Sequence, residues 1–491
     1  MPMFCYQCQE TKKNCGCTAG GMCGKKVQTA DLMDQLVRQL KILALTRKPD
    51  LALGRFVAEQ LFLTLTNTNF DDARLETGIE NAKALSGFAY APLGVMACAD
   101  ENVRSLRELL TYGLKGVAAY YIHAVRLGRE DPSICDFLFK ALAATVLEHS
   151  IEVLSELVLE CGRNAIAAME LLDRGNRERF GDPVLTPVRT GTGPRPGILI
   201  SGHDLQDLYE LLVQTDYSGV DVYTHGEMLP AHYYPGLKKF QHLYGNYGSS
   251  WFHQQEDFAR FQGPVIMTTN CIIPVQSSYR DRIFTTGPAG YPGIPHIPDG
   301  KPKDFSAVIA FAKSCPLPEQ QEHSVINGGP PDLQGIAEQV RTGVIRRIIV
   351  IAGCDGRHRS RDYYTQVAEA LPDDVLIMTA GCAKFRFLKR NQKNVIDAGQ
   401  CNDSYRIVTM IKTIRELSGI SVPVSFDLAW YEQKAVAVLL ALLTLGFRNI
   451  RLGPTLPAFL SGDVTTILHE QFGIRGITDP ETDIAAMLQG R

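Results

Sequence analysis

The chain repeats one pattern, a short apolar run that ends abruptly in a residue able to bind a metal. Cys354 follows the run 348–353, and His203, Cys271 and Cys382 follow the runs 197–202, 265–270 and 375–381. In an open parallel sheet the carboxyl ends of the strands converge on one crevice, so ligands far apart in sequence can meet there. The pattern therefore predicts an enzyme with a buried metal cluster.

Length and composition indicate an ordinary multidomain protein. The 491 residues are too many for one compact core, and 45% apolar with 21% charged residues is typical of globular chains. A formal net charge of −3 favours no nucleic acid or other polyanionic partner. The first residues lack an export signal, and the longest apolar stretch, 435–447, is too short to cross a bilayer. We therefore expect a cytoplasmic protein that binds neither nucleic acid nor membrane.

Helical periodicity fills the first part of the chain. Helices are expected at 29–46, 50–66, 71–86, 101–126, 131–147 and 150–175, which would make two three-helix bundles. Residues 181–197 are rich in glycine and proline and predict a linker.

Strands and helices alternate in the rest of the chain. Strands are expected at 197–201, 220–223, 264–268 and 306–311, and then at 346–352, 374–379, 421–426 and 449–452. The predicted fold is multidomain α plus α/β, with N-terminal helical bundles followed by two Rossmann-like domains with mainly parallel sheets. We expect a domain of residues 1–186 with the cysteine loop and the bundles, and two α/β domains of residues 190–318 and 319–491.

The N-terminus carries a cysteine cluster. Cys5 and Cys8 are followed after eight residues by Cys17 and after five more by Cys23. Thirteen cysteines in a large cytosolic chain are more typical of thiols and metal ligands than of disulfides. Four thiolates on a glycine-rich loop bind either tetrahedral zinc or an iron–sulfur cluster, and the spacing alone does not distinguish them. Cys15 is a spare thiol.

Three further candidate ligands lie beyond the strand-end residues. Glu227 follows the strand expected at 220–223. Cys401 precedes a helix, whose dipole is expected to lower the pKa of its thiol. Glu432 begins a buried apolar helix, where a carboxylate requires a partner.

The motifs together resemble a known family. The segments 4–11, 200–205, 224–230, 285–287 with 291–293, 380–384 and 430–434 are similar, in this order, to the hybrid cluster protein family, also called prismane protein or hydroxylamine reductase. The similarity extends from Cys5 to about Pro457 and is highly specific. The helical part looks shorter than in the longest members.

The resemblance implies two metal centres. A proximal [4Fe-4S] cubane cluster would be bound by Cys5, Cys8, Cys17 and Cys23. A hybrid [4Fe-2O-2S] cluster would be bound by His203, Glu227, Cys271, Cys354, Cys382, Cys401 and Glu432. Glu227, Cys354 and Glu432 would act in catalysis as cluster ligands, and in that family the cysteine at the position of Cys354 can be a persulfide. Thiolates suit soft sulfide-bridged irons, while imidazole and carboxylates suit harder oxygen-bridged ones.

The resemblance also implies the activity, the reduction of hydroxylamine to ammonia and water. Electrons would come from an external donor, such as a ferredoxin-like protein or an NADH-dependent reductase. Reduction of nitric oxide to nitrous oxide competes as the activity of the same cluster. Two further alternatives are an enzyme like carbon monoxide dehydrogenase, and a redox-sensing or nitrosylating protein.

Other cysteines and histidines need no metal. Cys315 follows an apolar run but lies outside the family pattern, so a packed thiol is the better interpretation, and Cys98, Cys135 and Cys161 are expected in the helical core. His225 could donate protons or be held structurally. Lys434 could supply protons or serve as an ion-pair partner.

Overall fold

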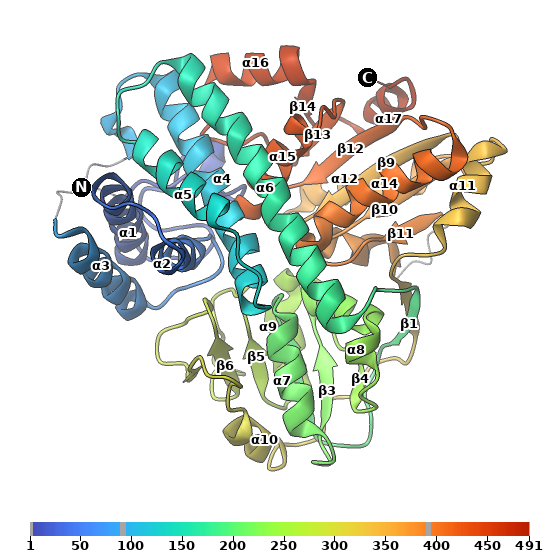
Figure 1. Cartoon of the computed structure of the whole chain (residues 1–491). Helices are drawn as coiled ribbons and strands as arrows, with labels where there is room; N and C mark the ends of the chain where they lie inside the picture. The colour runs from blue at the N-terminus through green and yellow to red at the C-terminus, as the bar shows by residue number, and fades with distance from the viewer. Residues whose placement is uncertain (1–2, 89–94, 389–393, 491) are drawn as a thin grey trace.

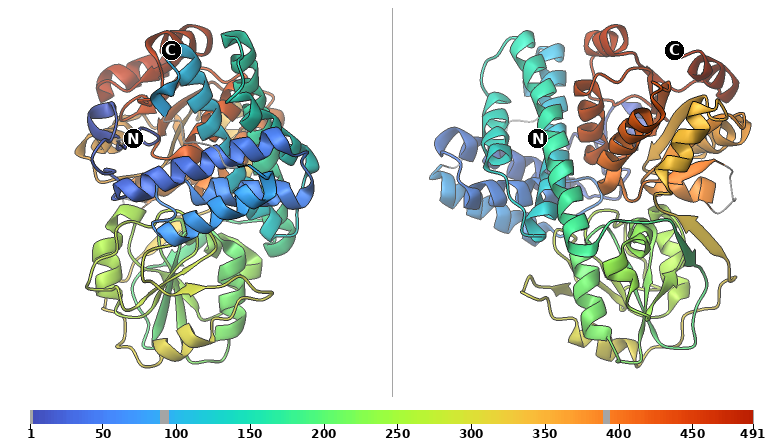
Figure 2. Two further views of the ribbon diagram at one scale, coloured as in Figure 1. Left: turned by 90° about the vertical axis from the view of Figure 1, so that its left-hand side faces the viewer. Right: turned by 45° about the vertical axis from the view of Figure 1, so that its right-hand side comes forward.

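The structure is a computed structural model that describes residues 3–88, 95–388 and 394–490 (Figure 1). A helical part, blue to teal, precedes a green-to-yellow parallel sheet and an orange-to-red one. The three parts meet at the centre of the molecule, as the two further views also show (Figure 2). The predicted fold class, helical bundles followed by two mainly parallel α/β sheets, is confirmed.

Side-chain caps begin most helices of the first part. These helices are α1 (Val27–Thr46), α2 (Leu51–Leu63), α3 (Asp72–Ser86), α4 (Glu101–Arg126), α5 (Pro132–Ala144) and α6 (Ile151–Phe180). In each helix from α2 to α6, the side chain of the residue before the helix accepts a hydrogen bond from a backbone N–H of the first turn. These residues are Asp50, Asp71, Asp100, Asp131 and Ser150. Such caps satisfy N–H groups that the helix itself leaves unpaired. The six predicted helices are all present, and α6 continues past residue 175.

The helices of the first part share one core. α2 packs against both α4 and α5, and α1 contacts α5, so the two predicted triplets are joined. The same core continues into the second sheet through α15 (Gln433–Thr444), which packs on α4 and α6. The approach is close, because a Cβ atom at Gly116 would lie 2.6 Å from the Gln433 carbonyl oxygen.

The first sheet is parallel throughout. Its strands are β2 (Gly197–Ser201), β3 (Asp221–Thr224), β4 (Leu243–Asn246), β5 (Val265–Met267), β6 (Ile283–Thr286) and β7 (His296–Ile297), in the order β4-β3-β2-β5-β6-β7. The connecting helices are α7 (Leu205–Thr215), α8 (Pro235–Lys238) and α9 (Gln254–Phe261). This strand order is that of a doubly wound dinucleotide-binding fold.

The second sheet repeats the same order. Its strands are β9 (Arg347–Gly353), β10 (Val375–Thr379), β11 (Val395–Asp397), β12 (Val424–Ala429), β13 (Ile450–Gly453) and β14 (Ile474–Gly476), ordered β11-β10-β9-β12-β13-β14 and parallel. Its helices are α11 (Leu333–Arg341), α12 (Asp362–Ala370), α13 (Phe385–Leu388), α14 (Ser404–Ser418), α15, α16 (Gly462–Phe472) and α17 (Pro480–Leu488). Both sheets therefore have a switch point, where the order of the strands reverses.

Two predictions about local structure are wrong. The strand expected at 306–311 is the helix α10 (Ser306–Ala312), whose Val308 and Ala312 pack on the first sheet, so a short apolar run was mistaken for a strand. The linker expected at 181–197 contains β1 (Thr186–Arg189), which pairs antiparallel with β8 (Val325–Gly328).

Within the described ranges, no helix combines the length and the apolar character needed to cross a lipid bilayer.

Candidate metal centre

The predicted ligands of the second site all follow strands at their carboxyl ends. From the first sheet, His203 follows β2, Glu227 follows β3 and Cys271 follows β5; from the second, Cys354, Cys382, Cys401 and Glu432 follow β9, β10, β11 and β12. The central pairs, β2 with β5 and β9 with β12, form the two switch points. Parallel sheets bind ligands at such points, and here two of them are directed at one place.

His203, Glu227 and Cys401 are the tightest group of these side chains. One donor atom of each lies within 4.8 Å of the others. His203 Nε2 is 3.2 Å from Cys401 Sγ, and its Nδ1 is 3.0 Å from the Thr269 hydroxyl, which orients the ring. The Cys401 backbone N–H donates to Glu227 Oε2 at 2.6 Å. Residues of opposite sheets are therefore joined directly.

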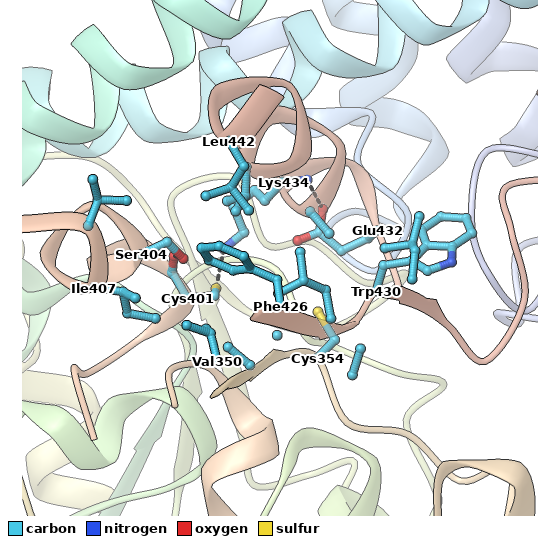
Figure 3. A pocket seen from close by; sticks show the side chains of 18 of the residues that line it. Val350, Cys354, Cys401, Ser404, Ile407, Phe426, Trp430, Glu432, Lys434 and Leu442 are labelled. Atoms are coloured by element: carbon cyan, nitrogen blue, oxygen red, sulfur yellow. Dashed lines mark hydrogen bonds between the residues drawn. The ribbon is translucent and has the colours of Figure 1, made fainter. Parts of the chain in front are cut away.

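Glu432 and Lys434 approach from the first turn of α15. The Glu432 carboxylate caps this helix by accepting the Lys434 backbone N–H at 2.8 Å, and Asn270 Nδ2 lies 3.5 Å from its other oxygen. The Lys434 ammonium is 3.2 Å from Cys401 Sγ (Figure 3). Of the two roles predicted for Lys434, this geometry favours that of a charge partner.

The remaining thiols pack in a cluster with two aromatic rings. Cys271, Cys354 and Cys382 share one apolar cluster with Trp251 and Tyr431, whose ring centroids are 4.6 Å apart. Cys271 has a φ of 81°, an unusual value for a residue with a side chain and one often found at functional sites.

A small cavity adjoins Cys354, Cys401 and Glu432 (Figure 3). Its volume is about 50 Å³, enough for a few water-sized molecules. Apart from these residues and Lys434, its walls are mainly apolar and include Val350, Ile407, Phe426, Leu428, Trp430 and Leu442. A small uncharged molecule fits such a space.

Burial dominates the electrostatics of the thiols. It raises the pKa of Cys401 to about 12 and the pKa values of Cys271, Cys354 and Cys382 well above their usual range. The prediction that a helix dipole lowers the pKa of Cys401 is therefore wrong, because burial outweighs it.

The donor set fits a cationic cluster. Two buried thiols, two half-buried thiols and two buried carboxylates are costly together without positive charge, and Glu227 Oε1 is buried without a hydrogen-bond partner. Burial alone would lower the pKa of Lys434, but the neighbouring Cys401 and Glu432 outweigh it and raise the pKa. Sulfur, nitrogen and oxygen donors around one point suit irons bridged by both sulfide and oxygen.

The N-terminal cysteines also gather. Cys5 and Cys17 exchange backbone hydrogen bonds of 3.0 and 2.8 Å, and their side chains pack together. Cys5, Cys8 and Cys23 line a space of about 20 Å³. Burial raises the pKa of the Cys5 thiol to about 12. The Cys15 side chain is exposed and donates to the Lys13 carbonyl, away from this group.

Hydrogen bonds connect the cysteine loop to the strand-end site. The Gln9 backbone N–H donates to the Tyr431 carbonyl at 3.0 Å, next to Glu432. The Arg361 guanidinium donates to Gln9 Oε1 at 2.8 Å and to the Cys354 carbonyl at 3.0 Å. One buried side chain thus contacts both cysteine-bearing segments.

Sequence reasoning gave no role to two buried cations of the site. Arg361 lies on a 3₁₀ turn before α12, where nothing in the local pattern marks it. Lys384 donates to the Gly399 carbonyl at 2.6 Å and lies 3.7 Å from Glu227 Oε1. Its position two residues after a strand-end cysteine could have marked Lys384 as a charge partner.

The other candidates lie outside the group. His225 has Nδ1 3.0 Å from the Ser201 hydroxyl and Nε2 3.2 Å from Asp257, so both ring nitrogens are engaged and the structural role is favoured. Cys315 is half-buried after α10. Cys135 and Cys161 are in the helical core as predicted, whereas Cys98 is only half-buried, before α4.

Comparison with known proteins extends these observations. Residues 3–485 match the model of the Prismane/CO dehydrogenase family. The hydroxylamine reductases of Nitratidesulfovibrio vulgaris and Chlorobaculum tepidum are each 48% identical to the chain. The alignments cover 100% of both proteins in the first case, and 99% of this chain and 100% of the relative in the second. The first alignment extends over 553 residues, more than the 491 of this chain, so the chain lacks segments that the relative has.

A solved structure has the same fold. Carbon monoxide dehydrogenase IV from Carboxydothermus hydrogenoformans superposes with a TM-score of 0.60 at 15% identity, covering 99% of this chain and 92% of the other.

Proposed function

Because the chain belongs to the Prismane/CO dehydrogenase family, we propose that it is an iron–sulfur oxidoreductase that reduces hydroxylamine. Hydroxylamine, two electrons and two protons would give ammonia and water. The observation that carries the proposal is the gathering of one imidazole, two carboxylates and several thiols from two sheets in one buried place. Relatives aligned over the full length bear the name of this activity.

The proposal assigns a cluster to each group of ligands. A hybrid [4Fe-2O-2S] cluster would be bound by His203, Glu227, Cys271, Cys354, Cys382, Cys401 and Glu432, and a [4Fe-4S] cluster by Cys5, Cys8, Cys17 and Cys23. When bound, the hybrid cluster supplies electrons and Lewis acidity for cleavage of the N–O bond.

The chain's own residues prepare the site for a small substrate. The apolar walls of the cavity exclude bulk water, and Lys434 offers ammonium N–H donors at its edge. The Thr269 hydroxyl fixes the orientation of His203, and the Glu432 carboxylate is fixed by the first turn of α15. These contacts hold the ligands in place before the substrate enters.

The N-terminal centre would relay electrons from an external donor. The Gln9–Tyr431 hydrogen bond and the Arg361 guanidinium support this role, because they connect its loop to Cys354 and Glu432 over few bonds. A ferredoxin-like protein or an NADH-dependent reductase would fit as the donor.

Nitric oxide is a second candidate substrate. The mainly apolar cavity of about 50 Å³ favours it, because a small uncharged diatomic molecule needs no polar recognition. Its reduction would join two molecules to form nitrous oxide and water, with two electrons and two protons consumed.

Anoxic purification tests the proposal. Iron, sulfide and nickel analysis with electron paramagnetic resonance should show two distinct clusters and no nickel, and the protein should turn over hydroxylamine with a reduced dye. A Cys354→Ala variant should lose the second cluster and the activity, while a Cys315→Ala control keeps both. Zinc alone, a single cluster, or nickel would contradict the proposal.

A further inference from the structure

A second, larger cavity lies between α1 and α4 in the helical part, beside the N-terminal cysteine loop. Its volume is about 320 Å³. Basic side chains dominate its lining: Arg38, Lys41, Arg104, Arg107 and Lys115, against the acidic Asp34 and Glu108. A local excess of positive charge in a chain of net charge −3 requires an explanation.

Three of the basic side chains donate to neutral acceptors. Arg104 donates to the Cys98 carbonyl at 2.7 Å, Arg107 to the Leu147 carbonyl at 2.6 Å, and Lys115 to Gln7 Oε1 at 2.9 Å. Among the residues that the structure describes, neither these three side chains nor Lys41 makes an ion pair within 4.0 Å. Lys115 is buried, and Lys41, Arg104 and Arg107 are half-buried. Cations that are partly removed from water and lack an ion pair favour the binding of a negative charge.

Two details mark where that charge is needed. Arg107 Nε is buried without a hydrogen-bond partner. Burial lowers the pKa of Lys41; the acidic Glu108 and Asp34 oppose this effect, while Arg38 and Arg107 lower the pKa further. An anion bound between Lys41 and Arg107 would relieve both.

We propose that this cavity binds a phosphate-bearing small molecule. A guanidinium group can donate two parallel hydrogen bonds to two oxygens of one phosphate, and a lysine ammonium adds a point charge. A multivalent anion balances the excess charge of the lining better than one carboxylate does. The volume exceeds that of a single phosphate, and Val37, Ile42 and Val146 provide an apolar wall for an organic part.

Lys115 connects the cavity to the N-terminal cysteine loop. Its ammonium lines the cavity and also donates to Gln7, between Cys5 and Cys8. An anion in the cavity would therefore lie close to the loop that holds the N-terminal thiols. Binding itself is independent of the function proposed above.

Calorimetric titration of the purified holoprotein tests this site. Inorganic phosphate, pyrophosphate and adenosine monophosphate would be added separately at constant ionic strength. We expect saturable binding at one site for at least one of them, with at least tenfold weaker affinity in Lys41→Met and in Arg107→Met. Lys140→Met, which removes an exposed lysine of α5, is the control and should bind as the wild type does.

The three probes also distinguish the ligand source. Tighter binding of adenosine monophosphate than of phosphate would indicate an organic ligand, and equal binding would indicate inorganic phosphate, both within the proposal. Absence of saturable binding to all three, or equal weakening in the control, would overturn it. If a variant fails to fold, chemical acetylation of the wild-type protein replaces its titration. The bound anion should protect Lys41, but not Lys140, from acetylation. Absence of protection at Lys41 would contradict the proposed site.

Discussion

The two parallel sheets have the same strand order but end in complementary residues. Of their first strands, β2 ends in His203 and β9 in Cys354; of the next, β3 leads to Glu227 and β10 to Cys382. At β5 and β12 the kinds are exchanged, with Cys271 on the first sheet and Glu432 on the second. Each of these equivalent pairs offers one sulfur and one nitrogen or oxygen donor.

The outer strands break this correspondence. Cys401 follows β11, whereas Tyr247, a poor metal ligand, follows the equivalent β4. The second sheet thus contributes most of the sulfur, and the first contributes the imidazole. The backbone therefore sets where a donor lies, while a single residue after each strand sets its chemistry.

The largest effect should come from removing a thiol of the second sheet. Cys382→Ala takes away a soft ligand, so the strand-end cluster should not assemble and hydroxylamine turnover should fall more than about 100-fold, beyond the cost of losing an outer contact. Metal analysis should find only the iron of the N-terminal centre. Retention of both clusters would show that Cys382 of the second sheet is not a required ligand.

Removing charge at the equivalent strand of the first sheet should cost less. Glu227→Gln keeps the shape and one oxygen donor, so turnover should fall roughly 10- to 100-fold with much of the iron retained. Electron paramagnetic resonance should show a changed second signal and an unchanged N-terminal signal. If Glu227→Gln lost turnover and iron as completely as Cys382→Ala, the two positions would contribute equally to the cluster, contrary to this prediction.

The contact between the cysteine loop and the second sheet should have a smaller effect. Arg361→Met removes the hydrogen bonds to Gln9 and to the Cys354 carbonyl, so stopped-flow reduction of the second centre should slow about tenfold. Arg359→Met, two residues earlier and exposed, is the matched control. Equal rates in both variants would remove Arg361 from the proposed relay.

Buried carboxylates provide the smallest test of the comparison. Asp221 of the first sheet pairs with Arg195 at 2.6 Å, whereas Asp427 of the second has no ion pair among the described residues, and burial raises its pKa to about 7. Since the folded state then holds a proton that the unfolded state has lost, stability falls as pH rises from about 4 to about 7.

Asp427→Asn should remove this dependence. At pH 8 the free energy of unfolding should rise on the order of 1–3 kcal/mol, with little change below pH 4, as urea titrations would measure. Burial also raises the pKa of Asp221, but Arg195 offsets part of this effect, so Asp221→Asn should stabilise less at pH 8 than Asp427→Asn does. An Asp221→Asn variant stabilised as much as Asp427→Asn would contradict this difference between the sheets.

The strand-end pattern predicted the fold better than it predicted the environment of each residue. An apolar run followed by a ligand located β2, β5, β9 and β10, because burial on both faces leaves a continuous apolar stretch. The same pattern failed at Cys315, where a run of equal length forms α10, since short buried helices and strands have similar composition.

Lys434 was predicted as an ion-pair partner and Lys384 could have been, but the contacts of Arg361 and Asn270 could not be predicted from the sequence. Lys384 and Arg361 act through contacts that the tertiary fold creates, and Asn270 reaches Glu432 across the two sheets. The prediction of a lowered pKa for Cys401 failed because a sequence shows where a helix begins but not how deeply its first residue is buried.

The close seating of α15 on α4 ties the last candidate ligand to the first part of the chain. The absence of a side chain at Gly116 leaves room for the Gln433 carbonyl, so an added methyl group there should push α15 away and displace the neighbouring Glu432 carboxylate. We therefore expect that the proposed metal site is completed only when the helical part has packed on the second sheet, and that an incompletely folded chain lacks one carboxylate ligand.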